Sequence, residues 1–131
     1  MKVYVATSFT EAPLAKTVME ALEIDGHHIT HNWTNENASG LQGDELTKYL
    51  TRCALADVDG VERCDVLLLL NNPKCRGAYT ELGMAIALKK QVIVVWNLVS
   101  PNIFFQVPGV SAVDSVGEAM ELIQKWSKEA A

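Results

Sequence analysis

The sequence predicts an α/β fold in which a mainly parallel sheet of five strands lies between two layers of helices. Short apolar runs of β-favouring residues alternate about five times with longer segments of helical periodicity. The runs at residues 65–70 and 91–96 are apolar at almost every position, which is typical of strands buried on both faces. Because parallel strands need crossover helices between them, this alternation predicts a three-layer domain.

The first strand and the first helix are predicted in the N-terminal 26 residues. Residues 2–6 are a short apolar run with β-branched character, and residues 7–10 form a turn rich in hydroxyl groups. A helix is expected to start near Glu11, with Pro13 in its first turn. Asp25-Gly26 is expected to end it.

The second strand is predicted at residues 28–33, with Ile29 facing the core and His31 as a second candidate for that face. The stretch 34–43 is rich in Asn, Ser and Gly, so we expect a loop over the ligand-binding edge of the sheet. A helix should open at Asp44 and break near residues 59–60. Its core-facing side chains are predicted to be Leu46, Tyr49, Leu50 and Cys53.

The third and fourth strands, at residues 65–70 and 91–96, flank a polar turn at 71–77 and a helix over 78–90. A short fifth strand is predicted at Val110 to Val113, after a loop that starts at Ser100. A last helix opens at Asp114 or Ser115 and buries Val116, Ala119, Met120, Ile123 and Trp126. We therefore expect residues 1–131 to form one domain of Rossmann- or flavodoxin-like architecture.

The charge balance excludes some partners. The formal net charge is −5, and the 11 Lys and Arg residues are scattered rather than clustered. A nucleic-acid polymer or an anionic membrane surface requires a basic face, so neither is the expected partner. Single nucleosides or nucleotides remain possible ligands, because a few hydrogen bonds can hold them.

The cysteines and the N-terminus predict a cytoplasmic protein. Cys53, Cys64 and Cys75 are odd in number and lack CxxC spacing, which favours reduced thiols over a disulfide framework or a zinc site. The first residues turn polar too soon for a signal peptide, and no apolar run is long enough to cross a bilayer.

Glu81 is the first candidate for catalysis. It follows a buried strand and lies in or near the first turn of the next helix, at the edge where open α/β sheets bind ligands. The helix dipole would hold the carboxylate ionised beside apolar walls, as a nucleophile requires. The alternative is that Glu81 only stabilises the helix start.

Tyr4 and Asp57 are the other two candidates. The Tyr4 hydroxyl could reach the same edge, or Tyr4 could be a core aromatic residue. Asp57 is expected near the end of a helix, where the dipole disfavours an acid, although exposed Asp residues are common there. Two carboxylates in one apolar cleft would have separated pKa values and could perform glycosyl transfer.

Several polar and aromatic residues are candidates for substrate binding. Thr7 and Ser8 lie in a turn that could cradle phosphate, although it has no glycine-rich pattern and Glu11 would repel an anion. Trp33 could stack on a base or pack in the core. The three histidines lack a metal-binding pattern, so we expect no metal site.

These residues resemble the nucleoside 2-deoxyribosyltransferase superfamily, which includes deoxynucleoside 5′-monophosphate N-glycosidases. The resemblance covers most of the chain. It rests on Tyr4 within the first strand, on Asp57 and Glu81 at a spacing of 24 residues, and on the Gly-x-x-x-Glu-Leu-Gly-x-Ala segment at 77–85.

The resemblance implies a retaining double displacement. Glu81 would be the nucleophile and form a deoxyribosyl ester, Tyr4 would orient its carboxylate, and Asp57 would help to protonate the leaving base. Water would complete hydrolysis, or a second base would complete transfer, without a metal or organic cofactor. Such proteins act as transferases or hydrolases in nucleotide metabolism.

The resemblance also implies a homodimer or larger homo-oligomer in which a neighbouring subunit closes the site. Asn102 or Ser100 would serve that purpose here, and residues 103–105 could supply apolar interface area. The further substrate-binding residues expected in this chain are Thr7, Ser8, Phe9, Trp33, Asn72, Cys75 and Gly77.

One segment and one further position depart from the family pattern. Residues 7–13 replace a Gly- and Arg-rich loop of the nucleotide-hydrolysing branch, and Cys75 replaces an Asp of the transferase branch. The sequence leaves open the base, the 5′-phosphate and the acceptor. The alternatives are a non-catalytic module that binds or senses a nucleotide, and a flavodoxin-like protein suggested only by the hydroxyl-rich turn.

Overall fold

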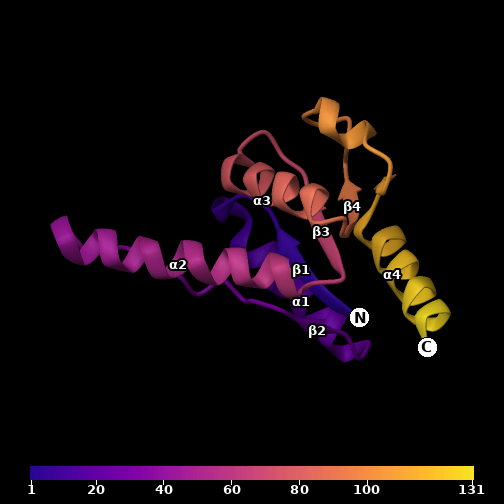
Figure 1. Cartoon of the computed structure of the whole chain (residues 1–131), viewed down its shortest axis with the longest axis horizontal. Coiled ribbons are helices and arrows are strands. Elements are labelled where there is room, and N and C mark those ends of the chain that lie inside the picture. The colour runs from indigo at the N-terminus through magenta and orange to yellow at the C-terminus, as the bar shows by residue number, and fades with distance from the viewer.

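The computed structural model of the chain covers residues 1–131 and shows a five-stranded sheet with helices on both faces (Figure 1). The strand order is β2-β1-β3-β4-β5, and every neighbouring pair is parallel. The elements in chain order are β1 (Lys2–Ala6), the 3-10 turn η1 (Phe9–Glu11), α1 (Ala12–Ile24), β2 (His28–Ile29), α2 (Gly43–Arg63), β3 (Val66–Leu70), α3 (Arg76–Ala87), β4 (Gln91–Val95), the 3-10 turn η2 (Ile103–Gln106), β5 (Val110–Val113) and α4 (Val116–Ala130). The predicted α/β class and parallel sheet are confirmed.

The strand order places a switch point between β1 and β3. From β1 the chain crosses to β2 on one side, and from β3 it crosses to β4 on the other. Because parallel crossovers are right-handed, the two connecting helices α1 and α3 cover opposite faces of the sheet. Ligands of open α/β sheets bind beyond the carboxyl ends of the strands at such a point.

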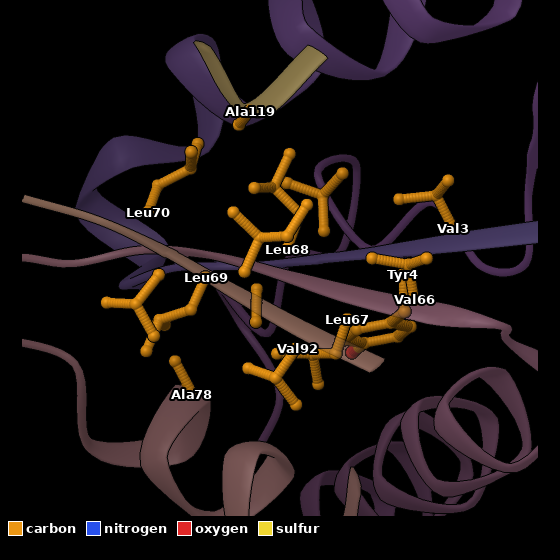
Figure 2. Close-up of a cluster of buried hydrophobic side chains, with 14 of the residues drawn as sticks. Val3, Tyr4, Val66, Leu67, Leu68, Leu69, Leu70, Ala78, Val92 and Ala119 are labelled. Carbon is orange, nitrogen blue, oxygen red and sulfur yellow. The ribbon is translucent and has the colours of Figure 1, made fainter. Parts of the chain in front are cut away.

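The core is centred on β3, whose five residues are all buried, as predicted. Figure 2 shows Leu68 and Leu70 pointing toward Ala119 of α4, whereas Leu67 and the Tyr4 ring lie on the opposite side of the sheet. The alternation follows from the period of two along a strand. Tyr4 therefore faces α2 and α3, the helices that carry the candidate carboxylates.

The second strand is much shorter than predicted. β2 comprises only His28–Ile29, not residues 28–33. Beyond it, side chains replace the sheet ladder: the Thr30 hydroxyl donates to the Gly60 carbonyl (2.8 Å), and the Arg63 guanidinium donates to the Thr30 carbonyl (2.5 Å). His31 consequently leaves the sheet and does not pack in the core.

The predicted break at residues 59–60 is wrong, because α2 runs without interruption for 21 residues. Gly60 is buried within this helix, and a Cβ there would lie 2.9 Å from the Tyr4 ring and from the His31 Cβ. The glycine therefore allows close packing of α2 on β1. Asp57 lies inside the helix, away from its C-terminal end.

The N-terminal half of α2 extends beyond the sheet (Figure 1). Of the predicted core-facing stripe, Leu50 is 50% exposed and Leu46, Tyr49 and Cys53 are half-buried, so the stripe is only partly buried. Leu55, outside the stripe, is 64% exposed. The other helix boundaries agree better with expectation. Pro13 lies in the first turn of α1, and the Ser115 hydroxyl caps α4 by accepting from the Glu118 amide (3.1 Å). None of the helices combines the length and the apolar character that a membrane crossing requires.

Candidate active site

A cleft of about 480 Å³ opens at the switch point of the sheet. Its walls come from β1 and the turn after it, from the segment after β2, from α2, and from the start of α3. Its volume is within the range of pockets that hold small molecules. The lining includes eight of the predicted site residues: Tyr4, Thr7, Ser8, Phe9, Trp33, Asp57, Gly77 and Glu81.

Tyr4 and Glu81 are joined directly. The Tyr4 hydroxyl donates a hydrogen bond to Glu81 Oε2 across 77 residues of sequence. Tyr4 is fully buried, and Glu81 is 9% exposed. The tyrosine thus fixes the position of one carboxylate oxygen and leaves the other free for a second partner.

Glu81 is not in the first turn of its helix, contrary to the prediction. α3 begins at Arg76 rather than at Ala78, so Glu81 is its sixth residue. The dipole effect is confined to the first turn, and burial dominates instead. Burial raises the pKa of Glu81 to about 7; the Tyr4 hydrogen bond opposes this rise and the Asp57 charge adds to it.

Asp57 faces the same cleft from α2. Its Oδ1 atom is buried without a hydrogen-bond partner, and His31 Nε2 lies 3.4 Å away. Burial and the Glu36 charge raise the pKa of Asp57 to about 6, whereas His31 and the Tyr4 hydroxyl lower it. Burial and the charge of Glu81 also raise the pKa of Tyr4, so its hydroxyl stays a donor. Between pH 6 and 7 the two carboxyl groups together hold about one proton.

A hydrogen-bond network joins the turns that follow β1 and β3. Thr7 Oγ1 donates to the Leu70 carbonyl (2.8 Å), and the Asn72 amide donates to Thr7 Oγ1 (3.1 Å) and Ser8 Oγ (3.0 Å). Thr7 and Ser8 line the cleft, whereas Asn72 does not. Asn72 therefore stabilises the hydroxyl-rich turn without being exposed in the cleft.

Phe9 and Trp33 form an aromatic wall. Their ring centroids are 6.2 Å apart, at an interplanar angle of 41°. Trp33 is 6% exposed, and its buried indole N–H donates to the Val5 carbonyl (2.8 Å), whereas Phe9 is 60% exposed. Most of the accessible aromatic surface at this end of the cleft thus belongs to Phe9.

Of three further residues predicted to bind substrate, only one lines the cleft. Gly77 lines the cleft from the first turn of α3. Cys75 is 2% exposed, its thiol directed at the Leu70 carbonyl (3.6 Å), and does not line the cleft. Asn102 is also outside the lining, and its side chain caps η2 by accepting from the Phe104 amide (2.9 Å).

The structure adds residues that the sequence reasoning did not select. Glu36, Lys74 and Arg76 carry charge, and the other additions are Ala54, Val58, Ala78, Thr80 and Met84. The sequence predicted that the loop 34–43 covers the site, and Glu36 is the only charged residue of that loop. Glu36 could therefore have been selected from the sequence. The two cations lie in the polar turn before α3 and at its start.

His31, Glu36 and Asp57 are the only cluster with the composition of a metal site. Their ligand atoms lie within 4.8 Å of one another. Ion pairing accounts for this grouping without a metal, because His31 Nε2 lies 3.4 Å from an oxygen of each carboxylate. The cluster therefore does not require a metal ion.

Comparisons with known proteins agree with this architecture. The family model for nucleoside 2-deoxyribosyltransferase matches residues 3–122. The solved structure of a CMP N-glycosidase from Clostridium botulinum superposes with a TM-score of 0.61 and 16% identity, over 94% of this chain and 98% of that one. A 2-deoxyribosyltransferase from Bacillus psychrosaccharolyticus superposes with a TM-score of 0.66 and 17% identity, over 92% and 90%. No curated protein matches the chain in sequence.

Proposed function

Because the chain belongs to the nucleoside 2-deoxyribosyltransferase family, we propose that it cleaves the N-glycosidic bond of a 2′-deoxynucleoside or its 5′-monophosphate. The observation that carries this proposal is the buried hydrogen bond from Tyr4 to Glu81, in a cleft that Asp57 also lines. In this arrangement Tyr4 holds one oxygen of the Glu81 carboxylate, and the Asp57 carboxyl group faces the same cleft.

The proposed first step forms an ester on Glu81. The ionised Glu81 carboxylate attacks the anomeric carbon while the bond to the base breaks, and Asp57 gives its proton to the departing base. The developing positive charge on the sugar favours the state in which Glu81 is ionised and the shared proton is on Asp57. Tyr4 keeps the nucleophilic carboxylate in position throughout.

The second step releases the sugar. A water molecule, or a second base, attacks the anomeric carbon, and the bond to Glu81 breaks. Asp57, now ionised, accepts the proton from the incoming nucleophile, so both carboxyl groups return to their starting states. The same geometry serves hydrolysis and transfer, and the choice depends on whether a second base displaces water from the cleft.

We propose a 5′-monophosphate as the better substrate. Lys74 and Arg76 line the cleft, and neither of them forms an ion pair with an acidic residue. The amides at the start of α3 and the Ser8 hydroxyl add hydrogen-bond donors. Arg76→Gln should raise KM for a monophosphate at least about tenfold and leave KM for the matching nucleoside unchanged.

The proposed oligomer would use the exposed arm of α2. Leu50 and Leu55 are largely exposed on this arm, and Ala54, between them, lines the cleft. A second copy packed on the arm would cover these leucines and narrow the cleft. Multi-angle light scattering of the wild type and of Leu55→Glu tests this: a dimer or larger species is expected, and Leu55→Glu should dissociate it. That Asn102 reaches a neighbour's site stays a prediction.

The cytoplasmic location also stays a prediction. Cys64 and Cys75 are buried free thiols, and Cys53 is half-buried. Burial raises the pKa of Cys64 to about 11, so this thiol is unreactive. These features suit a reducing compartment.

The test of the main proposal is base release from a panel of deoxynucleosides and their monophosphates, followed by chromatography. Intact-mass spectrometry of the reacting enzyme should show a deoxyribosyl unit, with or without phosphate, on Glu81. Full activity in Glu81→Gln would refute the proposed nucleophile. Calorimetric binding of a nucleotide without turnover of any panel member would select the non-catalytic binding module instead.

A further inference from the structure

His31 lies between two carboxylates at the wall of the cleft. Its Nε2 atom is 3.4 Å from Asp57 Oδ1 and 3.4 Å from Glu36 Oε2. The three side chains are 23% to 31% exposed, so the cluster reaches from the cleft to solvent. The proposed displacement uses Asp57 but gives no role to the other two.

Asp57 has few other sources of a proton. The Tyr4 hydroxyl donates to Glu81, and Asp57 Oδ1 is buried without a hydrogen-bond partner. Charged or titratable groups around it come from β1 (Tyr4), from α3 (Glu81), and from the segment after β2 (His31 and Glu36). Cys53, on α2 itself, is half-buried and its thiol is close to Glu36. His31 is the basic group among these, at 3.4 Å from Asp57 Oδ1 and partly exposed to solvent.

Glu36 is fixed in this cluster by its loop. Its backbone amide donates to the Trp33 carbonyl (3.1 Å), and the amide of Asn37 donates to the Tyr49 hydroxyl on α2 (2.6 Å). The loop is therefore held at both ends of the turn that presents Glu36. A carboxylate oxygen held 3.4 Å from His31 Nε2 orients the imidazole ring.

We propose that His31 and Glu36 are positioning residues that return a proton to Asp57 during each turnover. The inference rests on the proposed glycosidic cleavage. When Asp57 has given its proton to the leaving base, the His31 imidazolium transfers its Nε2 proton to the Asp57 carboxylate, and the neutral imidazole takes a proton from solvent. Before an incoming water attacks, the imidazolium releases a proton to solvent and Asp57 passes its proton back to the imidazole. The ionised Asp57 then accepts the proton of the water, so the protons balance.

His31 and Tyr4 both pack against Gly60 of α2, so the position of each depends on this glycine. A Cβ at Gly60 would lie 2.9 Å from the His31 Cβ and from the Tyr4 ring. Of the α2 cations, Arg63 is bound to the Thr30 carbonyl and to Asp59 (2.7 Å), and Arg52 lies over the Tyr49 ring (5.9 Å to the centroid). Both arginines are thus engaged elsewhere, which leaves His31 as the basic side chain next to Asp57.

The first test follows the protonation of Asp57 by carboxyl ¹³C NMR in the whole protein without substrate. His31→Gln should raise the pKa of Asp57, because a neighbouring cation is lost, and Glu36→Gln should lower it, because a neighbouring anion is lost. His28→Gln, at an exposed position on β2, is the matched control and should cause no change. The absence of both changes would overturn the proposal.

The second test is kinetic. His31→Gln should lower kcat at least about tenfold for the natural base, with KM nearly unchanged. It should leave within about twofold the rate for 4-nitrophenyl 2-deoxyriboside, whose leaving group departs without a proton. Equal losses on both substrates would show a merely structural role. If the wild type releases no base at all, glycosidic cleavage fails as a function, and the NMR titration alone decides the proton coupling.

Discussion

Glu81→Gln is expected to stabilise the folded protein at pH 8 and to change its stability little at pH 5. Burial raises the pKa of Glu81 from its ordinary value of 4.5 to about 7. Between these values the folded protein keeps the proton that the unfolded chain has lost. The free energy of unfolding contributed by this group therefore falls as the pH rises through that range.

The magnitude follows from the same two values. A carboxyl pKa raised from 4.5 to about 7 destabilises the fold by about 3 kcal/mol at pH 8 and by about 1 kcal/mol at pH 5. Glutamine carries no charge at either pH, and its carbonyl can still accept the Tyr4 hydroxyl hydrogen. The substitution should therefore remove the penalty and keep the contact.

Urea unfolding at both pH values measures this difference. Glu20→Gln, at an exposed position on α1, is the matched control, and it should change stability by less than about 0.5 kcal/mol at either pH. Equal stability of Glu81→Gln and wild type at pH 8 would show that the carboxylate is well solvated. The argument that burial raises the pKa of Glu81 would then be wrong, and so would the inference that this site is separated from solvent.

Three further outcomes are expected. Tyr4→Phe should raise the pKa of Glu81, because a hydrogen bond to the charged form is lost; the alkaline limb of the pH–rate profile, which follows the higher pKa of the pair, should move upward and kcat should fall about 10²-fold, whereas an unmoved limb would contradict this role. Wild-type kcat/KM should be greatest between pH 6 and 7, since at lower pH both carboxyl groups are protonated and at higher pH both are ionised; a flat profile would exclude the pair. Gly60→Ala should destabilise the fold by about 1 to 3 kcal/mol in urea unfolding, because its Cβ would meet the Tyr4 ring. Gly83→Ala on α3, where nothing lies within 4 Å of the new Cβ, should be neutral or stabilising, and the same loss at both glycines would refute the packing argument.

The regular elements were predictable because local periodicity identifies them. The continuous apolar run of β3 predicted a strand buried on both faces, and all five residues are buried. The fifth strand has the predicted bounds, Val110–Val113. α4 starts after Ser115, as the serine followed three residues later by Glu118 indicates. Each of these signals lies within a few residues of the element it specifies.

The errors fall where distant contacts override a local signal. Asp59-Gly60 has the composition of a helix end, yet α2 continues to Arg63, because Gly60 packs against the Tyr4 ring. Residues after Ile29 have strand character but leave the sheet, since Thr30 bonds to Gly60 and Arg63 of α2. In both cases the partner lies about 30 residues or more away and is invisible to local patterns.

The sequence by itself determined the order of strands and helices, the parallel sheet, and the choice of Tyr4, Asp57 and Glu81 as candidates. Only the tertiary structure decided that Tyr4 donates to Glu81 and that His31 lies between Asp57 and Glu36. It also reversed the expectation that the helix dipole keeps Glu81 ionised, because burial raises its pKa to about 7. Periodicity is a property of neighbours along the chain, whereas protonation depends on solvent exposure and on charges that folding brings together.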